Sequence, residues 1–407
     1  MKNNLIPIKT AHRWLTVANA LTETQFILPI LMLFYGYKGV SMGDFFLIQG
    51  ITCIGIFLLE VPTGYIGDIF SRKNTILLGA IAWIIGYMFL IFGYGFSQIL
   101  IGEIIFSVAI SLMSGTIEAY LYDILKKRHK EGSFHKKYAK MKTLSNLSIM
   151  IGSLSGAFLY QFIGPTAPLW ATVIGLVITC IILILLPDVP ESKRIVAENK
   201  SKWQDICDIS KYALKHKELK WLMLFPALYG TMTLILMWGL QSVMIVKQVP
   251  VFMFSIILST NAFMRVIWSG FSGKALEKLN LSGILILQSV VITIAAIGAS
   301  IAEYTNTFGV YICLFLMLLG SSSVVLSNIS STVLINHRIK SDERATILSV
   351  SSMINRIFWA IGMIALKPLF DTLGVSQTFL ITALLLFPIL LCAHHLYKMK
   401  LKTMAQP

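Results

Sequence analysis

Two arginines stand inside long apolar runs, where a charged side chain is costly. Arg356 lies near the middle of its run, beside Asn355 and three residues before Trp359. Arg265 lies in another run, with Asn261 four residues before it and therefore on the same helical face. A guanidinium group presents a rigid fork of donors that matches a carboxylate or a phosphate. The two arginines predict an anion-binding site; the alternative is an ion pair with an acid that locks one state.

The first apolar run carries a carboxyl group. Glu23 stands in a polar cluster with Asn19, Thr22, Thr24 and Gln25. An ionisable residue at the centre of a membrane span costs at least ~2.5–3.5 kcal/mol, so each one needs a function or a partner. A carboxyl group removed from water holds its proton more tightly, as a proton carrier must. We predict that Glu23, with Asn19 and Gln25, binds a proton or the substrate; a structural pair with an arginine is the alternative.

Five charged residues gather near the ends of the second and fourth apolar runs. They are Glu60, Asp68, Arg72, Glu118 and Asp123. Their position predicts an ion-pair network that holds a cytoplasmic gate shut, rather than a substrate site, with Asp68 also capping the following helix. Two further residues are candidates for other roles. Glu103 is a candidate proton site, and Tyr229 is a candidate residue of the substrate path, with helix packing as the alternative for Tyr229.

The composition defines the class of protein that holds these side chains. Of 407 residues, 56% are hydrophobic and 13% are charged, and the mean hydropathy is +0.76. A soluble core cannot hide that apolar fraction, so we predict an all-α polytopic membrane protein. The net charge of +15 comes from basic residues between the apolar runs, which indicates membrane topology rather than nucleic-acid binding. The sequence shows no nucleotide-binding loop, metal-ligand spacing or nucleophile–base pair, so we expect no enzyme activity, metal or cofactor.

Runs of about 20 apolar residues predict transmembrane helices. Twelve such runs lie near 14–37, 44–66, 75–96, 98–122, 142–163, 166–186, 219–246, 251–272, 282–302, 308–335, 345–367 and 375–397. With the N-terminus in the cytoplasm, 29 of the 34 lysines and arginines fall in inside segments and three fall outside. This asymmetry predicts that both termini are cytoplasmic.

The polar stretch 187–218 divides the twelve runs into two bundles. One six-helix bundle is predicted at 1–186 and the other at 219–407, with 187–218 as a cytoplasmic linker. The pattern from Gly64 to Asp68 has a degenerate echo from Gly270 to Lys274, at half the chain length. Such an echo is typical of two pseudo-symmetric repeats with a substrate path at their interface.

The hinge after the second run contains Gly64, Asp68, Arg72 and Lys73, with Ser71 before the basic pair. These residues resemble motif A of the major facilitator superfamily of secondary transporters, G-x-x-x-D-x-x-G-R-K, with Ser71 in place of its second glycine. Three further segments are similar to a bacterial subset of that superfamily that is rich in exporters. They are Glu60-Val-Pro-Thr-Gly64, Glu118-Ala-Tyr-Leu-Tyr-Asp123 and Glu343-Arg-Ala-Thr346. The resemblance implies the twelve-helix fold of the superfamily.

Two markers of the proton-coupled drug antiporters in that superfamily are missing. Motif B places an arginine in the fourth helix, about where this chain has Glu103. Motif C survives in the fifth helix only as Gly152 and Gly156. We therefore expect a solute other than a purely cationic drug, which Arg265 and Arg356 would repel.

Taken together, these features predict a secondary transporter. Its expected substrate is a small anionic or zwitterionic organic solute, such as a carboxylate metabolite or a siderophore-like molecule. Alternating access, driven by the proton gradient, would move the solute across a bacterial cytoplasmic membrane, with export slightly favoured. The alternatives are a multidrug efflux antiporter, an importer of a nutrient or siderophore, and a receptor that does not transport. The expected partners are the solute, protons and membrane lipids, and the expected state is a monomer.

Overall fold

The computed structural model describes residues 6–69, 71–189, 217–338 and 344–404, so most of the predicted linker 187–218 lies outside it. The described residues are almost entirely helical and contain no strand, which confirms the predicted all-α class. Among them, ten helical stretches are long and apolar enough to cross a membrane. The chain is a multi-pass integral membrane protein.

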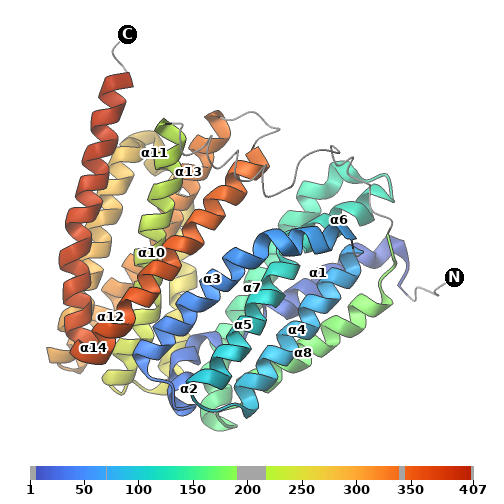
Figure 1. Ribbon diagram of the computed structural model, residues 1–407, viewed down its shortest axis with the longest axis horizontal. Coiled ribbons are helices and arrows are strands. Elements are labelled where there is room, and N and C mark those ends of the chain that lie inside the picture. The colour runs from blue at the N-terminus through green and yellow to red at the C-terminus, as the bar shows by residue number, and fades with distance from the viewer. Residues whose placement is uncertain (1–5, 70, 190–216, 339–343, 405–407) are drawn as a thin grey trace. The chain divides into compact units, whose positions relative to one another are not determined.

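Figure 1 shows the helices as they follow one another along the chain. They are α1 (Ile8–Glu23), η1 (Leu28–Ile30), α2 (Leu31–Tyr37), α3 (Met42–Ile69), α4 (Arg72–Phe92), α5 (Gly95–Met113), α6 (Thr116–Lys126), η2 (Glu131–Ser133), α7 (Phe134–Phe162), α8 (Ala167–Leu185), α10 (Lys217–Val246), α11 (Val251–Ile301), η3 (Ala302–Tyr304), α12 (Thr307–Ser322), α13 (Val324–Arg338) and α14 (Arg344–Met404).

Contacts divide the chain into two units. Unit 1 comprises Met1–Val40, Ile51–Lys200 and Val251–Ile256, and unit 2 comprises Ser41–Gly50, Ser201–Pro250 and Ile257–Pro407. Two helices are therefore shared. The helix α3 begins in unit 2 and continues in unit 1, whereas α11 begins in unit 1 and continues in unit 2.

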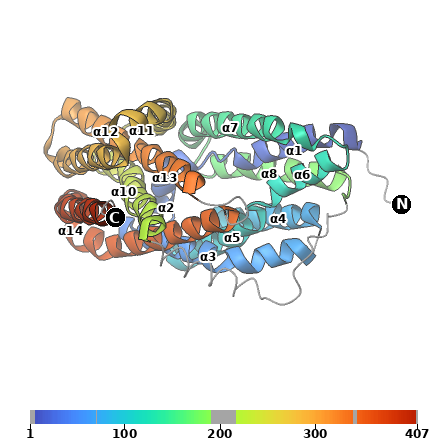
Figure 2. The same ribbon diagram turned by 90° about the horizontal axis from the view of Figure 1, so that it is seen from above.

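Each unit packs its helices around apolar side chains. In unit 1, α4 lies along α5, and α1 packs against α7 and α8. Ala11, Leu15, Ala80, Tyr120 and Leu183 belong to the buried core that α1, α4, α6 and α8 share. In unit 2, α10 lies amid α12, α13 and α14 (Figure 2). Because α10 packs against all three of these helices, it helps to position their polar residues.

The long element α11 contains both of the spans predicted in this region. Asn261 donates a hydrogen bond to Ser321, and Gln288 donates to the carbonyl oxygen of Ser323. A straight helix would separate residues 261 and 288 by about 40 Å at ~1.5 Å per residue. Because both reach the same turn of α12, α11 reverses direction between them.

Two predicted spans are not among the ten apolar stretches on their own. The predicted span 142–163 forms most of α7, whose many polar residues lower its hydropathy. The predicted span 375–397 is the second part of α14. Gly374, with φ 74°, separates the two parts of that element, and this left-handed backbone favours glycine.

The first predicted span, 14–37, is not one helix as expected. It ends as α1 at Glu23 and resumes at η1. A Cβ atom on Gly156 of α7 would lie 1.9 Å from the carbonyl oxygen of Phe26 in the interruption. The amide of Phe26 donates to the Thr172 hydroxyl at 3.3 Å. The helix therefore breaks where a neighbouring glycine makes room and a side chain satisfies the freed backbone.

We expect Gly156→Ala to destabilise the protein. Its new methyl group would force the unwound turn away from α7, and such overpacking costs roughly 1–3 kcal/mol. Gly273→Ala is the matched control, because a Cβ there meets open space, and in a helix it would be neutral or mildly stabilising. The apparent melting temperature in detergent measures both. Equal melting temperatures for the two variants would show that Gly156 is not needed for the break.

Candidate functional site

The polar residues of unit 1 gather beside the interruption of the first span. Glu23, the last residue of α1, is half-buried, and Glu118 of α6 and Lys142 of α7 act on its carboxyl group electrostatically. Lys142 forms an ion pair with Glu118 (Nζ–Oε1 3.1 Å), and its ammonium lies 5.5 Å from the centre of the Tyr138 ring. Two acids and one lysine from three helices therefore share one place, which we call the Glu23 cluster.

Asn19 and Gln25 lie on either side of Glu23. Asn19 is buried one turn earlier on α1 and donates to the Ser145 hydroxyl at 2.5 Å. Gln25 is half-buried in the interruption, where its backbone lies against Gly152 of α7. Asn19 therefore joins α1 to α7 one turn before Glu23, and Gln25 belongs to the unwound turn that follows Glu23.

The predicted gate residues separate into different contacts. Arg72 pairs with Asp123 (Nη1–Oδ2 2.6 Å) and also donates to the carbonyl oxygen of Ala119 at 2.9 Å. Its neighbour Lys73 pairs with Asp188 at 3.0 Å, after the end of α8. These bonds join α4 to α6 and α8 inside unit 1. Glu118 belongs to the Glu23 cluster instead.

The remaining two gate candidates lie on α3. Glu60 is half-buried, one turn before Thr63, whose hydroxyl donates to the carbonyl oxygen of Ser111 at 3.1 Å. The side chain of Asp68 lies outside the described residues. Ser71, rather than Asp68, caps α4, because its hydroxyl accepts from the amide of Asn74 at 3.3 Å.

We expect Arg72→Ala to destabilise unit 1 strongly. The side chain of Asp123 is only 3% exposed, so removal of Arg72 leaves a buried carboxylate without its cation, which costs roughly 3–5 kcal/mol. Adding Asp123→Asn should recover part of that loss, since no unpaired charge then remains. Lys142→Ala is the control: its pair is half-exposed, and pairs of that kind contribute about 0–1 kcal/mol. Thermal unfolding in detergent measures all three, and a similar loss for Arg72→Ala and Lys142→Ala would contradict the expectation.

In unit 2, Arg265 is surrounded by neutral groups. Its Nε donates to Asn261 Oδ1 at 3.2 Å, and its Nη2 lies 3.6 Å from the sulfur of Met237 on α10. Asn261 in turn donates to the Ser321 hydroxyl at 2.6 Å, and Trp268 donates to Ser322 of the same helix, α12. Within the described residues, no carboxylate lies within ion-pair distance of Arg265.

A second group of polar atoms comes from α14. Trp359 lies against Gly230 of α10, where a Cβ would come within 3.1 Å of the indole nitrogen. In the part of the chain that the structure describes, the Trp359 Nε1 and the Asn355 Oδ1 are buried and make no hydrogen bond. Arg356, half-buried, lies between them in sequence. Unsatisfied buried polar atoms are rare in proteins, so these two indicate a place where a further hydrogen-bonding group fits.

The α11 and α14 groups face the same side of α10. Gly230 contacts Trp359 and Met237 contacts Arg265. Seven residues separate these two contacts on α10, which is about two helical turns or ~10 Å. Arg265 and Trp359 therefore flank one face of α10, and Asn355 lies one turn before Trp359 on α14. We call these three residues the α10 site.

Tyr229 has a different role. It is fully buried, and its hydroxyl donates to the carbonyl oxygen of Leu285 at 3.0 Å and lies 2.6 Å from the Ser289 hydroxyl. Both partners belong to the second part of α11. Tyr229 therefore positions α10 against α11, and we leave it out of the α10 site.

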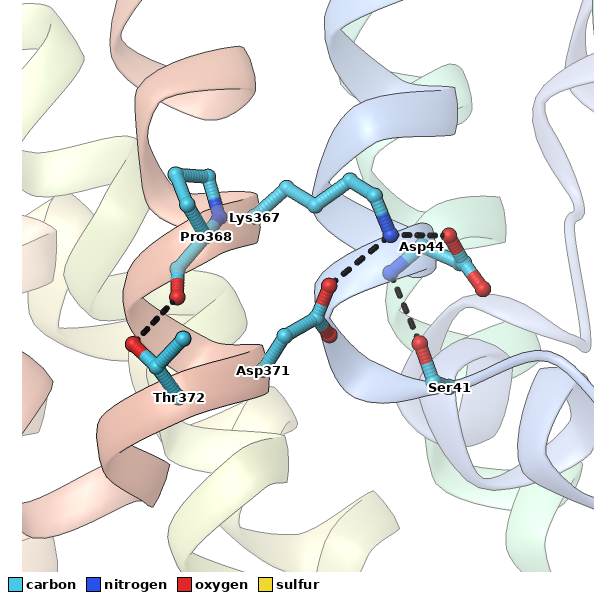
Figure 3. Close-up of polar contacts among 6 residues, drawn as sticks. All are labelled: Ser41, Asp44, Lys367, Pro368, Asp371 and Thr372. Atoms are coloured by element: carbon cyan, nitrogen blue, oxygen red, sulfur yellow. Dashed lines mark hydrogen bonds and ion pairs between the residues drawn. The ribbon is translucent and has the colours of Figure 1, made fainter.

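An ion triad joins the start of α3 to α14 within unit 2 (Figure 3). The ammonium of Lys367 lies 2.5 Å from Asp44 and 2.9 Å from Asp371. The backbone amide of Asp44 donates a hydrogen bond to the Ser41 hydroxyl at 3.0 Å. Next to the triad, a Cβ on Gly43 would lie 2.1 Å from a carboxylate oxygen of Asp371, so the two helices approach closely.

Sequence reasoning missed both this triad and Lys142. Charge counting treats Lys367 and Lys142 only as positive charges at the ends of predicted spans, and their partners Asp44 and Glu118 lie on other helices. The spacing of Lys367 and Asp371 (i, i+4) is a local signal for a helical ion pair. Nothing comparable links Lys367 to Asp44, because only the packing of α3 on α14 brings them together.

We expect the triad to contribute modestly to stability. Its side chains are 27–38% exposed, and exposed ion pairs contribute about 0.2–1 kcal/mol each. A double-mutant cycle with Lys367→Met and Asp44→Asn should give a coupling free energy in that range, which falls as salt is added. A coupling of several kcal/mol, or one that salt does not reduce, would contradict a solvent-screened triad.

Sequence comparisons identify related transporters. A model of the Major Facilitator Superfamily matches residues 14–363. The uncharacterized transporter BU466 of Buchnera aphidicola subsp. Acyrthosiphon pisum (strain APS) is 30% identical over 179 residues, which are 43% of this chain and 43% of that protein. The glucose transporter GlcP of Staphylococcus epidermidis (strain ATCC 12228 / FDA PCI 1200) is 25% identical over 151 residues, which are 37% of this chain and 32% of that protein. The matched part of the chain thus spans less than half of either relative.

Structural comparisons agree on the fold. The nucleoside transporter NupG matches with a TM-score of 0.78 and 14% identity, over 94% of this chain and 98% of that one. The POT family transporter PepTSo matches with a TM-score of 0.66 and 14% identity, over 96% and 98% of the two chains. At these identities the likeness concerns the fold alone.

Proposed function

Because the chain belongs to the major facilitator superfamily, we propose that this membrane transporter moves a small anionic or zwitterionic organic solute by alternating access. The observation that carries the proposal is the environment of Arg265. The Arg265 side chain is half-buried, its hydrogen-bond partners are neutral, and no carboxylate among the described residues neutralises it. An anionic group of a solute would supply the missing charge.

The neighbouring atoms support a site for a polar solute rather than for a lone ion. Trp359 offers a buried N–H group on the face of α10 that Arg265 also flanks. Asn355, one turn before Trp359 on α14, offers a buried carbonyl oxygen. A molecule with a carboxylate and a further donor or acceptor group would satisfy all three residues. Such a solute also explains why the buried polar atoms are retained in helices that otherwise carry apolar side chains.

The Glu23 cluster of unit 1 supplies charges of both signs. Glu23 and Glu118 would attract an ammonium group or a proton, and Lys142 holds one of them in an ion pair. We assign to Glu23 the coupling of transport to the proton gradient, or the recognition of the positive end of a zwitterion. The unwound turn at Gln25 adds backbone groups to the same place, as interrupted helices do at transport sites in other membrane proteins.

We also propose that both termini lie on the cytoplasmic side of the membrane. The distribution of basic residues favours the cytoplasmic membrane of a bacterium with both termini inside. In this proposal, protons drive the transport cycle. Resemblance to exporters favours export, and import of a nutrient or siderophore is the alternative. A cationic multidrug substrate is the second candidate, because the acids of the Glu23 cluster would attract a cation.

Ligand-induced thermal stabilisation tests the anion site. Purified wild-type protein, Arg265→Gln, Arg356→Gln and the control Lys278→Gln are screened against carboxylates, carboxylate siderophores, amino acids and cationic drugs. The control removes an exposed lysine of the same element, α11. A charge-assisted hydrogen bond is worth about 1.5–3 kcal/mol, so Arg265→Gln should weaken binding of the stabilising anion by roughly 10- to 100-fold.

Flux in proteoliposomes then separates a transporter of that ligand from a receptor. A ligand that stabilises the protein and moves across the membrane with a proton gradient supports the full proposal. Stabilisation by cations alone, unchanged in Arg265→Gln, would reject the anion site and favour the multidrug alternative. Binding without any flux would favour a receptor.

A further inference from the structure

The two ends of the α10 site differ in the groups that they can bind. At one end, the Nε of Arg265 donates to Asn261 at 3.2 Å, and its Nη2 lies 3.6 Å from the sulfur of Met237. A guanidinium group has several N–H donors and no acceptor. Within the described residues, these two contacts leave N–H groups of Arg265 for a solute. This end therefore fits a carboxylate.

At the other end, Trp359 and Asn355 present one donor and one acceptor. The indole Nε1 and the Asn355 Oδ1 are buried, and neither makes a hydrogen bond in the part of the chain that the structure describes. Four residues separate them on α14, so they share one face of that helix. An indole N–H group only donates, and a side-chain carbonyl oxygen only accepts. This end therefore fits a neutral group that carries both an acceptor and a donor.

Gly230 of α10 leaves space beside the indole N–H group. A Cβ on Gly230 would have the Trp359 Nε1 as its nearest neighbour at 3.1 Å, and the next ring atom would lie at 3.8 Å. An oxygen that accepts from an N–H group lies about 2.7–3.2 Å from the nitrogen. Any other residue at position 230 would therefore place a carbon atom where an acceptor of the solute can lie.

The face of α10 between the two ends is apolar. Gly230 and Met237 are seven residues apart, which is ~10 Å along the helix. Leu234 lies between them on the same face, and both Leu234 and Met237 are half-buried. The hydroxyl of the buried Thr233 donates to the carbonyl oxygen of Gly230, within its own helix, at 3.0 Å. The part of a solute that lies along this face is therefore apolar.

We propose that the α10 site selects an acid that also carries an amide group, with an apolar chain about 10 Å long between the two groups. The carboxylate binds Arg265. The amide carbonyl oxygen accepts from Trp359, and the amide N–H group donates to Asn355. This inference rests on the proposed function and names the substrate class of the same site.

The choice of an amide follows from the two protein atoms that it must satisfy. A second carboxylate has no donor for Asn355, and an ammonium group has no acceptor for Trp359. A hydroxyl group can donate and accept, but it does both from a single atom. An amide donates and accepts from two atoms, which suits two protein groups that lie one helical turn apart.

Thermal-shift titrations of the purified protein with synthetic acids test the inference. The probes are the monoamides of succinic, adipic, suberic and sebacic acid. The comparators are octanoate, ω-hydroxyoctanoate, suberate and the uncharged suberamide. We expect the suberic and sebacic acid monoamides to bind most tightly, because their extended length best matches the spacing of the two ends. Two added hydrogen bonds should make the suberic acid monoamide bind roughly 5- to 100-fold more tightly than octanoate.

Substitutions at the two ends should affect this ratio of affinities differently. Trp359→Phe keeps an aromatic ring without the N–H group, and Gly230→Ala places a methyl group beside that N–H group. Either change should reduce the ratio by roughly 3- to 10-fold, because one hydrogen bond to the amide is lost. Arg265→Gln should weaken the binding of both acids and leave their ratio near the wild-type value. Trp170→Phe is the matched control, because Trp170 is an exposed tryptophan of α8.

The outcomes separate this inference from the proposed anion site. A ratio that is unchanged in both Trp359→Phe and Gly230→Ala would overturn the inference. In the wild type, ω-hydroxyoctanoate or suberate binding as tightly as the monoamide would also overturn it, and this comparison needs no variant to fold. If octanoate and suberate still stabilise the wild type but not Arg265→Gln, the anion site stands and only its amide end fails. If no carboxylate stabilises the protein, both fail.

Discussion

Water is excluded from the interior of these helices, so each polar atom there must find its partner inside the protein. The interruption of the first span shows what this demands. The freed amide of Phe26 reaches the hydroxyl of Thr172, and Gly156 leaves the space that the turn occupies. The serines of α12 meet the same demand for Asn261 and Trp268. Hydroxyl side chains and glycines are therefore the residues that allow this bundle to carry polar groups.

The exceptions to that rule are the most informative places in the molecule. Arg265 has neutral partners only among the described residues, and Trp359 and Asn355 bury polar atoms that make no hydrogen bond there. Asp123, by contrast, forms an ion pair with Arg72, and Asn19 donates a hydrogen bond to Ser145. Groups that are fully matched hold helices together. Polar groups whose hydrogen-bonding or charge is not satisfied in this way are the ones to which a solute or a proton can bind.

The helix α3 connects three of the features described above. Asp44, at its start, takes part in the ion triad with Lys367, and Thr52 holds Glu103. Glu60 and the hinge that follows lie near its end. With 28 residues it is about 42 Å long, and its first turns belong to unit 2 while the rest belongs to unit 1. The helix α3 is therefore an element that both units share.

The sequence alone determined the class, the number and order of the apolar runs, and the family. Those features depend on composition, on segment length and on a local motif, which are properties of neighbouring residues. It also singled out Glu23, Arg265 and Glu103, because a charge inside an apolar run is visible without any fold.

The tertiary structure decided which partner each charge meets. The pairs Glu118–Lys142 and Asp44–Lys367 join helices that are distant in sequence, and no spacing rule relates them. The break after Glu23 depends likewise on a glycine of α7, and the surroundings of Arg265 depend on α10 and α12. Periodicity shows that a residue is buried, but its neighbours follow from how separate helices pack, which local sequence does not encode.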